Sequence, residues 1–171
     1  RYTDDLARLV GDGWPLVVMN APYDLTLLDR NCRRLGVPTL TDRLGDTPLA
    51  PVLDPLVLDT YVVPKRRRVS PTQGARQLKT LCEVWGLGWD DDRAHGAEYD
   101  CLQAARVVWQ ICERTPEVGA STPLELHSRQ VGWRAEQQAS YAAWLADQGK
   151  DTSRIDPAWP MRPAESVAGA R

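Results

Sequence analysis

The sequence predicts an α/β fold with parallel strands. Short apolar runs of strand length alternate with longer segments whose apolar residues recur at helical spacing, and this order favours parallel pairing. Two Ser/Thr-x-x-Glu/Gln sequences mark helix starts, and glycines follow several of the apolar segments where helices should end. The 171 residues suffice for one domain with its own core.

The first predicted strand follows a short helix near the N-terminus. The apolar residues of that helix are Leu6, Leu9 and Val10. The unbroken apolar run from Pro15 to Met19 indicates a strand buried on both faces. Asn20 then suits an N-cap, and Pro22 suits a first helical turn. The helix that follows has an apolar face and ends at Gly36; the face consists of Leu25, Leu28, Cys32 and Leu35.

The second predicted strand lies beyond a proline-rich loop. We expect the loop from about Val37 to Pro55 and the strand from Leu56 to Val63, with Asp59 as a local hydrogen-bonding residue near its end. The sequence Ser70-Pro71-Thr72-Gln73 matches a capping box and predicts the start of the next helix. That helix carries Leu78, Leu81, Cys82 and Trp85 on one face.

The last third of the chain should be helical and then irregular. After the acidic loop 90–92, one helix has an apolar face of Cys101, Ala105, Val108, Trp109 and Cys112. A second capping box, Thr122 to Glu125, opens a long helix that should lie against the core or a partner. Its spacing favours packing over base stacking for Trp133, Tyr141 and Trp144, and we expect His127 to be structural or on the surface.

Composition points to a soluble, cytoplasmic protein. Hydrophobic residues make up 43% and charged residues 26%, and no apolar run approaches the roughly 18 residues of a membrane span. No secretory leader is recognisable. The four cysteines lack Cys-x-x-Cys spacing, so we expect buried free thiols in a reducing compartment; they are Cys32, Cys82, Cys101 and Cys112.

The charge distribution is uneven. A net charge of −2 does not make the whole protein attractive to nucleic acid, but the stretch from Tyr61 to Lys79 holds six basic residues and no acid. Lys65 and Arg66 in this stretch are candidate phosphate contacts. The alternative is a solvated loop, the usual fate of a charge run.

Three polar residues stand where the fold alone does not require them: Asp24, His95 and Asp100. Asp24 follows a buried strand, in the region where α/β folds place their sites. Each alone has a structural explanation, such as Asp24 as a favourable charge at a helix N-terminus. The His95–Asp100 pair downstream of the Asp24 segment favours a site instead. A thiol nucleophile at Cys101 is disfavoured, because that residue lies on the predicted apolar face.

These residues carry a family resemblance. The sequence Asn20-Ala21-Pro22-Tyr23-Asp24 resembles the second motif of DnaQ-like exonucleases, and 95–100 resembles the third, His-x-Ala-x-x-Asp. Residues 74–82 are similar to the segment that lies between these two motifs in the family. The resemblance covers roughly residues 5 to 115. The tyrosine-bearing subclass would need Tyr four residues before the Asp, at position 96. This chain has Gly96 there, so the DEDDh subclass, which uses His, is indicated. The proofreading epsilon subunit of DNA polymerase III and RNase T belong to this family.

The resemblance implies a ribonuclease-H-like α/β fold and 3′–5′ exonuclease activity on single-stranded DNA or RNA ends. It implies two divalent ions, Mg²⁺ or Mn²⁺, with Asp100 as a direct ligand, Asp24 as a ligand through water and His95 as the general base. Carboxylate oxygens suit these ions, and a neutral imidazole can accept the proton. Asn20 and Tyr23 are candidate contacts to the terminal nucleotide, although Tyr23 also fits a core position.

The chain departs from the family in one respect. The Asp-x-Glu motif that supplies two of four carboxylates is absent, as are the family's first three strands. Because residue 1 is Arg, we expect an N-terminally truncated, incomplete fold with half a metal site, inactive alone and prone to associate through an exposed strand edge. The expected parts are a partial exonuclease domain, 1–115, a C-terminal helix, 116–148, and a proline-rich tail, 149–171.

Two alternatives remain open. The chain could be a non-catalytic remnant that binds nucleic acid or a polymerase, or an accessory protein that docks through its C-terminal helix. A homodimer is also compatible with the sequence. The sequence does not separate DNA from RNA, since recognition of a strand end needs no base-specific residue.

Overall fold

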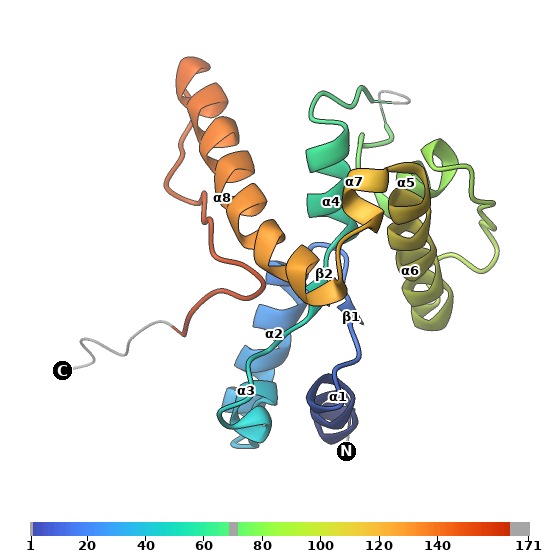
Figure 1. Ribbon diagram of the computed structural model, residues 1–171. Helices are drawn as coiled ribbons and strands as arrows, with labels where there is room; N and C mark the ends of the chain where they lie inside the picture. The colour runs from blue at the N-terminus through green and yellow to red at the C-terminus, as the bar shows by residue number, and fades with distance from the viewer. Residues whose placement is uncertain (1, 69–71, 165–171) are drawn as a thin grey trace.

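The structure is a computed structural model that describes residues 2–68 and 72–164. This part of the chain is mostly helical, around one two-stranded sheet whose strands are parallel, an arrangement that agrees with a mostly helical α/β class (Figure 1). The elements are α1 (Tyr2–Gly11), β1 (Leu16–Val17), α2 (Ala21–Arg34), α3 (Leu40–Leu44), β2 (Val52–Leu53), α4 (Pro55–Val62), α5 (Leu78–Val84), α6 (Ala97–Arg114), α7 (Pro116–Gly119) and α8 (Pro123–Asp147).

The sheet is short and lies at the centre of the molecule. Leu16 is opposite Val52 and Val17 is opposite Leu53. Backbone hydrogen bonds extend the pairing by one residue, from the Val18 N–H to the Leu53 carbonyl, 3.0 Å. Each strand leads directly into a helix, β1 into α2 and β2 into α4 (Figure 1). The starts of these two helices therefore meet at the same end of the sheet.

The predicted second strand is wrong. Residues Leu56 to Val63 fall almost entirely in α4, and the strand lies earlier, at Val52–Leu53 inside the predicted loop, which also contains α3. Asp54 caps α4 by accepting the Leu56 N–H at 2.9 Å, and Pro55 occupies the first helical turn. A short apolar run fits a buried helix as well as a strand, so these two residues decide the outcome.

The two predicted capping boxes have different outcomes. Thr122 and Glu125 form theirs: the Glu125 carboxylate accepts the Thr122 N–H at 2.7 Å, and the Thr122 hydroxyl accepts the Glu125 N–H at 3.3 Å. The other box does not open a helix where predicted. Its first two residues, 70 and 71, lie outside the described residues, while Thr72 and Gln73 lie in bends before α5 begins at Leu78.

The buried face of α6 differs from the predicted one. Trp109 is 65% exposed, and Ala105 is exposed as well. The residues that face the core are Tyr99, Gln103, Ala104, Val107, Val108 and Ile111. Gln103 makes this face hard to recognise in the sequence, because a polar residue is not expected in the core. Its side-chain amide is buried and donates a hydrogen bond to the Gly88 carbonyl at 2.8 Å. The prediction that every cysteine is buried is also wrong, since Cys101 is exposed; all four are free thiols.

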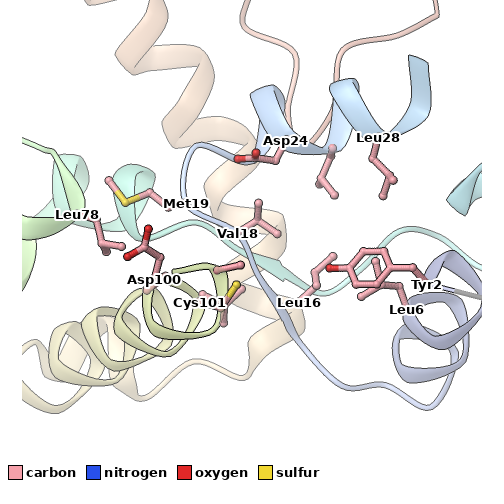
Figure 2. A pocket seen from close by; sticks show the side chains of 14 residues that line it. Tyr2, Leu6, Leu16, Val18, Met19, Asp24, Leu28, Leu78, Asp100 and Cys101 are labelled. Carbon is pink, nitrogen blue, oxygen red and sulfur yellow. The ribbon is translucent and has the colours of Figure 1, made fainter. Parts of the chain in front are cut away.

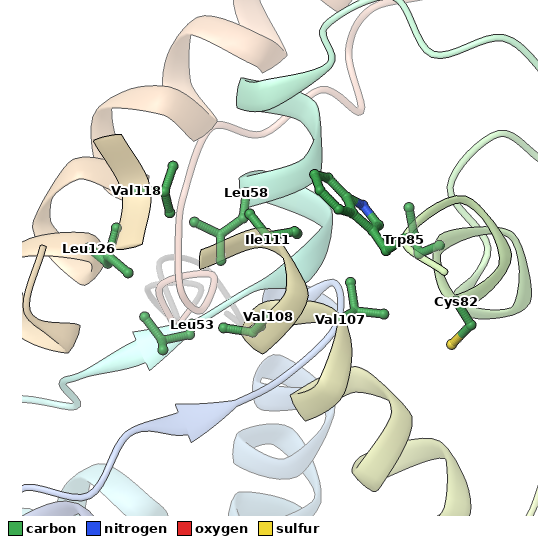
Figure 3. Close-up of a cluster of buried hydrophobic side chains, with 10 residues drawn as sticks. Leu53, Leu58, Cys82, Trp85, Val107, Val108, Ile111, Val118 and Leu126 are labelled. Carbon is green, nitrogen blue, oxygen red and sulfur yellow. The ribbon is translucent and has the colours of Figure 1, made fainter. Parts of the chain in front are cut away.

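The core forms between the sheet and the helices around it. Its largest cluster brings together Leu58 of α4, Trp85, Ile111 of α6 and Val118 of α7 (Figure 3). A second cluster lies against β2 and the start of α2, and Trp159 from the C-terminal segment belongs to it. The segment after α8 is irregular, as predicted, but it is not a free tail. It runs back past α8 and buries Trp159 to 8% exposure (Figure 1).

A buried ion-pair network fixes the basic stretch to the core. Asp59 of α4 has no exposed surface. Its carboxylate accepts hydrogen bonds from Arg66 Nε at 2.9 Å, Arg76 Nε at 3.0 Å and Trp85 Nε1 at 2.8 Å. Lys65, the neighbour of Arg66, is exposed. The expected local role of Asp59 at a strand end is therefore replaced by a structural role inside a helix.

We predict that Asp59→Ala lowers the free energy of unfolding by about 3–5 kcal/mol, because it leaves two guanidinium groups without their buried carboxylate. Urea denaturation followed by circular dichroism measures this. Asp46→Ala, at an exposed carboxylate, is the matched control and should change the value by no more than about 0.5 kcal/mol. A loss below about 1 kcal/mol for Asp59→Ala would show that the network does not hold the basic stretch in place.

Candidate functional site

A single carboxylate joins the end of the sheet to the starts of two helices. Asp54 follows β2 and is completely buried. One of its oxygens accepts the N–H groups of Asn20 and Leu56, and the other accepts the N–H of Ala21, each at 2.9 Å. Burial raises the pKa of Asp54, while these N–H donors favour the ionised form and oppose that shift. Asp54 thus caps both α2 and α4.

Asn20 occupies the N-cap position of α2, as predicted, but its side chain makes no capping hydrogen bond. Its backbone is left-handed, with φ 56°, a conformation that Asn adopts more readily than most residues. This turn points the N–H groups of Asn20 and Ala21 at Asp54, which supplies the cap instead. The sequence analysis missed Asp54, although Asp followed by Pro after an apolar pair is typical of a helix start.

The long helix α8 is bound to the same junction. Gln130 is fully buried; its side chain accepts the Asp54 N–H at 2.8 Å and donates to the Val52 carbonyl at 3.0 Å. One turn earlier, His127 Nδ1 accepts the Val52 N–H at 3.1 Å. His127 is therefore structural, one of the two roles expected, and α8 packs on the core through its first half.

A cavity of about 500 Å³ lies beside β1, between α1 and the first turns of α2 and α6. Its walls are mostly aliphatic, with Leu16 and Val18 on one side. Figure 2 shows the carboxylates of Asp24 and Asp100 on these walls, together with the sulfur atoms of Met19 and Cys101. Two acids from separate motifs therefore share one apolar cavity.

The two carboxylates differ in their surroundings. Asp24 lies in the first turn of α2; its side chain remains exposed, and partial burial raises its pKa above the ordinary value. Asp100 lies in the first turn of α6, and its Oδ1 atom is buried with no hydrogen-bond partner among the described residues. A buried carboxylate oxygen normally has a donor, a water molecule or a cation beside it.

The remaining predicted residues do not line this cavity. His95 is exposed in the loop before α6, with a left-handed backbone at φ 66°. Tyr23 is 64% exposed, so the alternative of a core position is wrong. Lys65 is exposed in the basic stretch, whereas the Arg66 side chain is only 13% exposed in its ion pair with Asp59. The structure therefore gathers Asp24 and Asp100, and gives Arg66 a structural role.

The cavity does not hold a complete set of metal ligands from the described residues. Within ranges 2–68 and 72–164, no group of three or more His, Cys, Asp or Glu side chains is placed to hold a metal ion.

The described parts of the chain contain no helix long and apolar enough to cross a membrane. Comparison of the chain with models of protein families, with curated proteins and with solved structures found no match.

Acidification should destabilise the fold through His127. Burial lowers the pKa of His127 below 6.5, so the unfolded chain takes up a proton more readily than the folded one. The free energy of unfolding should therefore fall as the pH drops below about 6.5. Protonated Nδ1 could no longer accept the Val52 N–H.

Thermal denaturation between pH 7.5 and 5.5 measures this effect. His127→Gln is the informative variant, because a Gln oxygen can accept the Val52 N–H without titrating. We expect the midpoint temperature of the variant to depend less on pH than that of the wild type. Equal pH dependence of the two proteins would contradict the role of His127.

Proposed function

We propose that this chain carries part of the active site of a DEDDh-type 3′–5′ exonuclease of ribonuclease-H-like fold. One observation carries the proposal: Asp24 and Asp100, from the two motifs that resemble that family, line the same cavity. The buried, unpartnered oxygen of Asp100 supports it further, because such an atom suits a cation. The short parallel sheet and the helices that follow its strands are compatible with this fold.

The residues present fit half of the donor set for two divalent ions. Carboxylate oxygens are preferred ligands of Mg²⁺ and Mn²⁺. When bound, such ions activate a water molecule and stabilise the leaving oxygen of the broken phosphodiester bond. Two carboxylates are too few to hold both ions, so we propose that the other donors come from outside these 171 residues.

Three residues of the chain have proposed roles in catalysis. Asp100, which lines the cavity and has one buried oxygen without a partner among the described residues, would bind an ion directly, and the more exposed Asp24 would bind through water. Ion binding favours the ionised carboxylate, so it should oppose the rise in the pKa of Asp24 that partial burial causes. His95, which lies in the exposed loop before α6, would accept a proton from the attacking water.

The proposed substrate is the 3′ end of single-stranded DNA or RNA. The exposed ring of Tyr23 lies one residue before Asp24 and can support a terminal base. Asn20 precedes the same helix and offers an amide to the nucleotide. Lys65 is exposed and can contact a phosphate. A homodimer or a polymerase partner remains part of the proposal.

A second candidate function is nucleic-acid binding without catalysis. It is favoured by the position of His95 outside the cavity lining and by the lack of a three-ligand group in the described parts of the chain. The two candidates differ in whether adding the missing carboxylates produces hydrolysis.

Activity should require those carboxylates. We predict that the 171-residue chain does not shorten a 5′-labelled single strand in Mg²⁺ or Mn²⁺. A protein in which an apolar strand with Asp-x-Glu precedes residue 1 should shorten it from the 3′ end. In that protein, His95→Ala should lower the rate by about 10²- to 10⁴-fold, and Asp100→Asn should abolish ion-dependent cleavage.

Asp46→Asn, at an exposed acid outside the cavity, is the control and should leave the rate unchanged. Binding of the strand without shortening by the longer protein would favour the non-catalytic candidate. Shortening by the 171-residue chain that disappears in Asp100→Asn would show that two carboxylates suffice and would contradict the half-site.

A further inference from the structure

A second concave surface lies between α4 and α8. It has a volume of about 720 Å³, and Tyr61 and Pro64 line it on one side while Trp133, Tyr141 and Trp144 line it on the other. In Figure 1 the second half of α8 stands apart from α4, beyond the turns that pack on the sheet. We call this surface the α4/α8 cleft. It shares no lining residue with the cavity that holds Asp24 and Asp100.

Two aromatic stacks are exposed to different degrees in the α4/α8 cleft. Tyr61 and Trp133 stack with ring centres 3.8 Å apart, and both pack on the main core cluster. Tyr141 and Trp144 also lie nearly parallel, with ring centres 5.9 Å apart, but they are 48% and 51% exposed. The predicted packing role is confirmed for Trp133, whereas Tyr141 and Trp144 pack against each other and remain about half exposed.

One cation lies over the exposed stack, and another lines the cleft. Lys150 Nζ lies 5.1 Å from the centre of the Trp144 ring. Arg134 lines the cleft, and its Nε atom is buried without a hydrogen-bond partner among the described residues. Glu136 is the one acidic residue among the described residues of the lining. Beyond Pro64 the chain continues into the basic stretch, where exposed cations follow at Lys65, Arg67 and Arg68.

Flat aromatic faces combined with cations suit one class of ligand. Single-stranded nucleic acid stacks its bases on aromatic rings and pairs its phosphates with Lys and Arg. An apolar protein segment would use the rings but would leave these cations without partners. The charge around the cleft therefore favours a polyanion over an apolar helix.

We propose that the α4/α8 cleft binds single-stranded nucleic acid, with bases against Tyr141 and Trp144 and phosphates near Arg134 and Lys150. This inference rests on the proposed function for the identity of its ligand and adds a contact surface away from the two carboxylates. Exposed aromatic residues at the end of a long helix then serve to hold the strand. A stacked base contributes on the order of tenfold or more to affinity.

The test is the dissociation constant of a 5′-fluorescein-labelled oligothymidylate, measured by fluorescence anisotropy with the 171-residue chain. EDTA is present, so that no ion-dependent hydrolysis occurs, and the salt concentration is low. We expect Trp144→Ala and Tyr141→Ala each to raise the dissociation constant about tenfold. Lys150→Ala should weaken binding and reduce its dependence on salt.

Trp109→Ala provides the matched control, since Trp109 is 65% exposed on α6 and lies outside the cleft. It should leave the dissociation constant unchanged. Equal effects of Trp144→Ala and Trp109→Ala would overturn the proposal, as would the absence of oligonucleotide binding by the wild type. Sedimentation equilibrium tests the rival occupant: a dimer that dissociates in Trp144→Ala would assign the cleft to a second copy of the chain.

Failure of this inference differs from failure of the proposed function. Asp100→Asn should retain oligothymidylate binding in EDTA, because the ring stack and the cations remain. Weakened binding in Trp144→Ala supports the cleft even if the longer protein proves inactive. Hydrolysis by the longer protein with unchanged binding in Trp144→Ala would overturn the cleft and leave the exonuclease proposal intact.

Discussion

The buried carboxylate of Asp54 is the constraint on which the site depends. It accepts N–H groups from Asn20, Ala21 and Leu56, and so fixes the starts of α2 and α4 at the end of the sheet. Each helix start presents N–H groups that need acceptors, and no water is required when one buried carboxylate serves both. Because Asp24 lies in the first turn of α2, its position beside the cavity follows from this cap.

Local patterns in the sequence predicted the features near Asp24 well and those near Leu56 badly. The buried strand, the following helix and the polar residues at their junction are all coded within a few neighbouring residues. Whether 56–63 is strand or helix depends instead on Asp54 and Pro55, which start a helix there, and the burial of Asp54 is made possible by the Ala21 N–H from another part of the chain. The face of α6 was misplaced for a similar reason, because Gln103 is buried through a bond to the Gly88 carbonyl.

The site itself was predictable only as a set of residues. Spacing within a motif indicated Asp24 and Asp100, and the fold brings them to one cavity. No pattern in the sequence indicated that Asp59 binds Arg66, or that Tyr141 and Trp144 lie beyond the part of α8 that packs on the core. Such outcomes depend on which surfaces the neighbouring helices cover, and a helical repeat of apolar residues does not contain that information.

Amide hydrogen exchange in Asp54→Ala tests the central role of this carboxylate most directly. We predict that Asn20, Ala21 and Leu56 lose protection together, and by a larger factor than amides in the middle of α6, since all three donate to the same side chain. If protection of these amides falls only as much as protection in α6, the helix starts are held without Asp54, and its central role is contradicted.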